Sequence, residues 1–118
     1  MTQKISVLTL AISAVAALAA ERFITAGGDY PAAGSNAFGA ATTSAMPGEL
    51  VATDVIGTTV ITAGGAIAKN AFVQVGAAGK AVSRTTGIAV AQALQAAAAD
   101  GDRIEVLLIP NGPAAPAP

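Results

Sequence analysis

The 118-residue chain contains neither cysteine nor histidine. Without cysteine, the chain has no disulfide, no thiolate nucleophile and no cysteine-ligated metal. Without histidine, it lacks the commonest general base, the commonest protein ligand for metals and every Ser–His triad. A small hydrolase is therefore the weakest hypothesis, and the two absences favour a structural or binding role.

Charge is also scarce, with six basic and seven acidic residues and a net charge of −1. No basic patch is available to neutralise phosphates, so we expect no binding to nucleic acid. The longest uncharged apolar run, residues 5–20, is short and rich in alanine for a transmembrane helix. We therefore expect no membrane span.

Large apolar side chains are fewer than the hydrophobic fraction of 53% suggests. The sequence has 31 alanines, and only 32 residues are Val, Ile, Leu, Met, Phe or Tyr. Because alanine buries little area, the core of this single domain is predicted to be thin for its length. Such a domain would gain much stability from the surface of a partner.

Short strands alternate with turn signals along most of the chain. Strands are predicted near residues 23–25, 37–42, 50–55, 58–62, 72–75, 80–84, 88–94 and 103–109. Phe38 is expected to be buried, Ile56–Gly57 to form a bend, bulge or hairpin, and residues 66–70 to form one helical turn. Turn signals every 8 to 12 residues or so predict an all-β fold, a small β-sandwich or barrel of about seven or eight short strands.

Residues 86–109 (TGIAVAQALQAAAADGDRIEVLLI) carry the clearest pattern. Large aliphatic residues alternate with alanines, the Asp100-Gly101-Asp102 sequence predicts a reversal, and Ile104, Val106 and Leu108 then share one face. An alternative makes residues 91–99 a helix, since alanine favours helices. Because an isolated nine-residue helix is marginal, the strand is the favoured prediction for residues 88–94.

The N-terminal segment is apolar and is predicted to be an assembly arm. Residues 1–20 form this arm, residues 21–110 the β-domain, and residues 111–118 a Pro/Ala-rich tail with no core to join. Neither a period of two nor a helical period places the large residues of the arm on one face. We expect these side chains to bind a neighbouring copy or another protein: Ile5, Val7, Leu8, Leu10, Ile12, Val15 and Leu18.

No group of residues predicts catalysis or a cofactor. Gly76 to Lys80 lacks the first glycine and the Ser/Thr of a phosphate loop, so a hairpin turn is the better interpretation. Asp100, Asp102 and Glu105 offer fewer oxygen ligands than calcium requires. The remaining carboxylates are scattered and are expected to be solvated: Glu21, Asp29, Glu49 and Asp54.

Taken together in order, several segments resemble phage capsid cement, or head decoration, proteins. The segments are residues 18–25 (LAAERFIT), 39–41, 48–63 (GELVATDVIGTTVITA), 65–79 and 87–108. The resemblance implies a non-enzymatic virion protein on the exterior of an icosahedral capsid, where it would stabilise contacts between major capsid subunits. It also implies a homo-oligomer, with a trimer favoured.

A hypothesis of a different class is a secreted bacterial surface or adhesion module. Residues 1–19 would then be a signal peptide, because Lys4 precedes the apolar run and Ala17-Leu18-Ala19 has the form of a cleavage site. The single basic residue and the hydroxyl residues inside the run argue against it. The mass of the mature protein distinguishes the two hypotheses.

Overall fold

The computed structural model describes residues 4–109, which form eight β-strands and one short 3-10 helix, η1 (Ala77–Gly79). The all-β prediction is confirmed. The strands are β1 (Ser6–Ser13), β2 (Arg22–Ile24), β3 (Gly39–Ala41), β4 (Leu50–Thr62), β5 (Phe72–Val75), β6 (Ala81–Ser83), β7 (Ala91–Ala93) and β8 (Arg103–Leu108). Within residues 4–109 no helix is long and apolar enough to cross a membrane.

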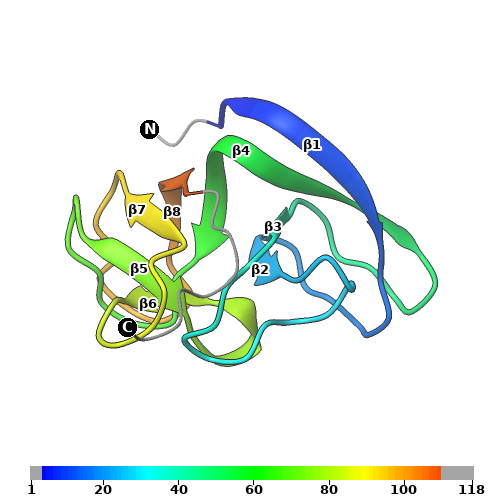
Figure 1. Ribbon diagram of the computed structural model, residues 1–118. Coiled ribbons are helices and arrows are strands. Elements are labelled where there is room, and N and C mark those ends of the chain that lie inside the picture. The colour runs from blue at the N-terminus through cyan, green and yellow to red at the C-terminus, as the bar shows by residue number, and fades with distance from the viewer. Residues whose placement is uncertain (1–3, 110–118) are drawn as a thin grey trace, which may run out of the picture.

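The long strand β4 organises the sheet, whose order is β2-β3-β4-β8-β7-β5-β6 with β1 also paired to β4. The first half of β4 lies between β1 and β3, and its second half pairs with β8 (Figure 1). A parallel bridge from Ala63 to Ala81 then brings β6 back to the end of β4, and the Gly64 amide donates to the Ala81 carbonyl at 2.7 Å. The sheet is therefore a nearly closed barrel.

Alanines line much of the barrel interior. The core contains Ala63, Ala81, Ala91 and Ala93 beside larger fully buried side chains, namely Phe23, Ile61, Val73, Val75 and Val106. Small side chains allow the strands of a narrow barrel to approach closely, so alanine is used where a larger residue would overpack. In β8, Ile104, Val106 and Leu108 face this core as predicted.

A second, smaller core lies beneath the first half of β4. It consists of Ala14, Leu18, Ile24, Ala41, Ala45 and Val51, with Ile12 and Tyr30 packed against it. The Tyr30 hydroxyl accepts a hydrogen bond from the Ala19 amide at 2.7 Å, which satisfies the polar tip of the ring. This core anchors the chain directly after β1.

Several local predictions are wrong or need correction. The strand expected at residues 88–94 is reduced to β7, and the alternative helix at 91–99 does not form. Residues 66–70 form no helical turn, because Ile67 is buried in the barrel core and bridges Ala97. Phe38 is only half-buried and precedes β3. Residues 50–55 and 58–62 belong to one strand, and its register against β1 is irregular on both sides of Ile56, where a bend, bulge or hairpin was expected.

Candidate interaction surface

β1 is attached to the domain along one edge. It pairs antiparallel with β4 from Ser6 opposite Gly57 to Ser13 opposite Leu50, with irregular register around Leu8. In the part of the chain that the structure describes, β4 is the only strand that pairs with β1. β1 is thus an edge strand, and it arches along the outside of the molecule in Figure 1.

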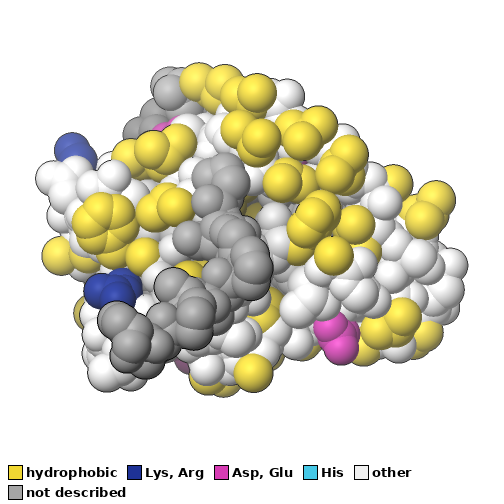
Figure 2. All heavy atoms as spheres, viewed as in Figure 1, with side chains coloured by type: hydrophobic (Ala, Val, Ile, Leu, Met, Phe, Trp, Pro, Cys, Tyr) yellow, Lys and Arg dark blue, Asp and Glu magenta, His cyan; other side chains and the backbone are white. Residues whose placement is uncertain are grey.

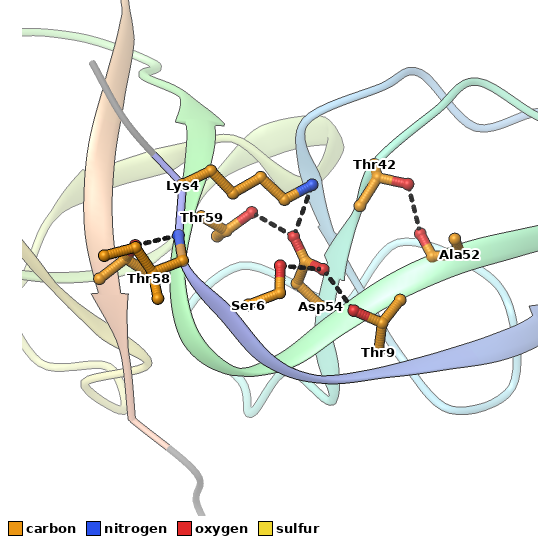
Figure 3. A network of polar contacts seen from close by, with 9 residues as sticks. Lys4, Ser6, Thr9, Thr42, Ala52, Asp54, Thr58 and Thr59 are labelled. Atoms are coloured by element: carbon orange, nitrogen blue, oxygen red, sulfur yellow. Dashed lines mark hydrogen bonds and ion pairs between the residues drawn. The ribbon is translucent and has the colours of Figure 1, made fainter. Parts of the chain in front are cut away.

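A buried carboxylate fastens this edge strand to β4 (Figure 3). Asp54 is 1% exposed, and its Oδ1 accepts hydrogen bonds from the hydroxyls of Ser6 and Thr9, each at 2.9 Å. Its Oδ2 accepts from the Thr59 hydroxyl and forms an ion pair with Lys4 Nζ, each at 2.9 Å. Three of the four partners belong to the N-terminal segment, so we call this group of five residues the Asp54 latch.

The latch also sets the charge state of Asp54. Burial raises the pKa of its carboxyl, but the hydrogen bonds outweigh burial, and the net pKa lies below the ordinary value of 3.8. The largest lowering contribution comes from Lys4, followed by the hydroxyls of Thr59, Ser6 and Thr9. The carboxylate is therefore ionised at neutral pH, where it accepts bonds from all four donors.

Glycine at position 57 permits the close approach at the start of β1. A Cβ on Gly57 would lie 2.2 Å from the Ile5 carbonyl oxygen, and its φ of +110° is one that side chains disfavour. The Thr58 amide donates to the same carbonyl at 2.8 Å, and the Thr58 hydroxyl accepts from the Ile5 amide at 2.8 Å. The backbone of the N-terminal segment is therefore held against β4 immediately before β1.

The seven predicted partner-binding residues are divided between surface and core. Ile12 is half-buried against the smaller core, and Leu18 is buried in it, where it bridges Ala45. The other five are exposed: Ile5, Val7, Leu8, Leu10 and Val15. The fastening of β1 is thus mainly polar, and most of its large aliphatic side chains stay at the surface.

Three further exposed residues enlarge this apolar surface, and no sequence pattern singled them out. Ile56 lies opposite Leu8 and Leu50 opposite Ser13 across the β1–β4 pair, and Met46 lies in the loop before β4. Figure 2 shows hydrophobic side chains gathered where Figure 1 draws β1 and β4. We call these eight exposed residues the β1–β4 surface: Ile5, Val7, Leu8, Leu10, Val15, Met46, Leu50 and Ile56.

Most of the other carboxylates singled out in the sequence form hydrogen bonds or ion pairs that hold turns and loops in place. Asp102 accepts hydrogen bonds from the amides of Ala98 and Ala99, which stabilises the reversal around Gly101, whose φ is +95°. Asp100 forms an ion pair with Lys80 at 2.9 Å. Similar roles belong to Glu21 with Arg103, Asp29 with Thr25 and Glu49 with the Met46 amide.

Comparison with known proteins identifies the family of this chain. The family model of phage cement proteins matches residues 2–108, nearly the whole chain. The chain belongs to the phage cement protein family. The match includes residues 2–19 of the segment that the alternative hypothesis assigned to a signal peptide, and β1 lies within that segment.

A solved structure has a similar fold. It is the N base of the head fiber protein gp8.5 in bacteriophage phi29, with a TM-score of 0.71 and 17% sequence identity. The similarity covers 86% of this chain and 93% of that one. No curated protein matches the sequence.

Family membership confirms the resemblance noted in the sequence. It makes this cement protein a structural component of the phage capsid, located on the exterior of the virion.

Proposed function

We propose that the protein binds the outer surface of an icosahedral phage head and stabilises contacts between major capsid subunits, without enzymatic activity. The observation that carries this proposal is the β1–β4 surface. It contains eight of the ten large hydrophobic residues that are exposed in the described part of the chain. Exposed large apolar side chains concentrated on two neighbouring strands and the adjoining loops are typical of sites of association between proteins.

The composition of the surface suits attachment to another protein. β1 has no charged residue, and the nearby Lys4 is already paired with Asp54. Val7 and Leu50 are 70% and 71% exposed, so a partner that covers them removes nearly whole aliphatic side chains from water. Burial of each would contribute about 1.5 kcal/mol or more to binding.

The test is binding of purified protein to phage heads that lack it. Wild-type protein should attach at a fixed ratio to the major capsid protein and raise the temperature at which heads release DNA. Val7→Ser combined with Leu50→Ser should weaken attachment at least roughly 150-fold, which corresponds to about 3 kcal/mol.

Phe72→Ser serves as the matched control. Phe72 is 50% exposed at the start of β5, outside the β1–β4 surface. This variant should attach as well as the wild type. Attachment that is equal in the double variant and the wild type would refute a role for the β1–β4 surface, and a lack of attachment by the wild type would refute the proposed function itself.

A further inference from the structure

The outer edge of β1 carries backbone groups that no other strand of residues 4–109 pairs with. The Ala14 amide donates to the Glu49 carbonyl, so the backbone groups of Ala14 point toward β4. Ala52 lies opposite Ala11, but its carbonyl accepts from the Thr42 amide on the other side of β4, so it does not pair with Ala11. Because backbone groups alternate in direction along a strand, those of Leu10 and Ile12 point toward β4. Those of Thr9 and Ala11 therefore point away from it, and no strand of residues 4–109 pairs with that edge.

This edge lacks most of the features that protect edge strands. Natural edges carry lysine, proline, bulges or covering loops. The irregular register lies at the beginning of β1, between Ser6 and Thr9, and the loop at Gly28 lies against the Ser13 carbonyl at its end. The central part of β1 contains no charge and no proline.

The side chains of the edge form a pattern that is symmetric about Leu10. Leu8, Leu10 and Ile12 share one face by the period of two, and the positions between them are Thr9 and Ala11. In an antiparallel pair of two such strands centred on Leu10, Leu8 lies opposite Ile12 of the other copy and Leu10 lies opposite itself. Every cross-strand pair on that face is then aliphatic, and no like charges meet.

We propose that β1 pairs with β1 of a second copy of this chain about a twofold axis at Leu10. Thr9 and Ala11 exchange backbone hydrogen bonds with Ala11 and Thr9 of the other copy, and the two sheets continue into one another. Such a contact is isologous, because the same patch is used on both copies. It depends on the homo-oligomer that the family resemblance implies but not on attachment to a capsid, and it is separate from any threefold contact made elsewhere on each copy.

A single cysteine placed on the twofold axis provides the test, because the chain has none of its own. In the proposed register Leu10 occupies a non-hydrogen-bonded pair with a Cα–Cα separation of about 4.5 Å, which a disulfide spans. Leu8 is 39% exposed and Leu10 is 40% exposed, so Leu8→Cys is a control of equal accessibility. The two Leu8 Cα atoms would be about 13 Å apart along the strands, too far for a disulfide.

Oxidation of the full-length variants in solution, in the absence of capsids, is followed on non-reducing gels. Leu10→Cys should form a covalent dimer at least tenfold faster than Leu8→Cys, and a mixture of Leu8→Cys with Ile12→Cys should form a covalent heterodimer. Equal rates for the two single variants, or no dimer of Leu10→Cys, would overturn the proposal. Because no particle is present, either result leaves the proposed capsid function to its own test.

A backbone substitution tests the hydrogen bonds of the edge. Ala11→Pro, in the Leu10→Cys protein, removes one amide donor from the free edge without removing a bond to β4. Covalent dimer formation should fall at least tenfold, whereas Ala11→Ser, which keeps the amide, should leave it unchanged. Dimer formation that persists in a folded Ala11→Pro protein would contradict strand pairing.

Discussion

Conversion of Asp54 to asparagine should destabilise the N-terminal strand more than the barrel. Asp54→Asn keeps the shape of the side chain but replaces one acceptor oxygen with an NH2 group. At Oδ2 that group would meet Lys4 Nζ and the Thr59 hydroxyl, and at Oδ1 it would meet the hydroxyls of Ser6 and Thr9. In either orientation the latch loses acceptors that its donors require.

The size of the effect follows from the burial of the latch. A hydrogen bond to a charged group contributes about 1.5 to 3 kcal/mol. Hydroxyls can rotate to accept from the new NH2 group, but the ammonium group of Lys4 cannot accept a hydrogen bond. The ion pair contributes little by itself, because the Lys4 side chain is 37% exposed. We expect a loss of about 2 to 3 kcal/mol, or a fall in melting temperature of about 8 to 12 °C for a domain of this size.

Thermal melting and amide hydrogen exchange together test this reasoning. Glu49→Gln is the matched control, because Glu49 is exposed and accepts one hydrogen bond from the Met46 amide. It should change stability by no more than about 0.5 kcal/mol. In Asp54→Asn, exchange should accelerate at Leu10 and Ile12 while Ile61 in the barrel stays protected at low temperature. Equal melting temperatures for Asp54→Asn and the wild type would refute the latch.

Three further predictions concern backbone, pH and tail. Gly57→Ala should lower the free energy of unfolding, measured by denaturant titration, by at least about 1 kcal/mol more than Gly48→Ala does. Both glycines have positive φ, but a side chain at position 57 would also collide with the Ile5 carbonyl, whereas nothing lies near position 48. The pKa of Asp54 is lower in the folded protein than in the unfolded chain. The ionised Asp54 carboxylate therefore stabilises the fold above about pH 4, and this stabilisation is lost as pH falls through the folded pKa. The difference in stability between wild type and Asp54→Asn should accordingly shrink below about pH 4. Deletion of residues 111–118, which lie outside the described residues, should leave the unfolding midpoint nearly unchanged, and a large drop would show that the tail docks on the domain.

The strands of the barrel were largely predictable because their patterns are local. Residues 72–75 are a short apolar stretch with turn residues on both sides, and they form β5. Residues 103–108 place Ile104, Val106 and Leu108 on one face, and in β8 this face is buried in the core. The pattern of β7 showed alternation but not which face is buried. Ala91 and Ala93 face the barrel interior, where space is narrow, and this depends on the closure of the sheet rather than on any neighbouring residue.

The latch, by contrast, could not be predicted from the sequence. Thr9 and Ser6 are 45 and 48 positions from Asp54 along the chain, so their contact depends on the register between β1 and β4. That register includes two irregularities, and a shift of one residue would turn Asp54 to the other face. The carboxylate was therefore expected only to be solvated, although it is among the most buried polar groups in residues 4–109.

Polar fastening explains how β1 stays on the domain while its aliphatic side chains remain at the surface. An apolar strand usually binds its own domain by burying those side chains, which then cannot contact a partner. Here the hydroxyls of Ser6 and Thr9 and the ladder to β4 hold the strand instead. Val7, Leu8 and Leu10 remain exposed, at a cost in stability that burial against another protein would recover. Asp54→Asn should therefore weaken attachment to heads more than its loss of stability explains, because it frees the strand that carries the β1–β4 surface. A variant destabilised to a similar extent in the barrel core, such as Ile61→Ala, should attach normally at temperatures where both proteins are folded.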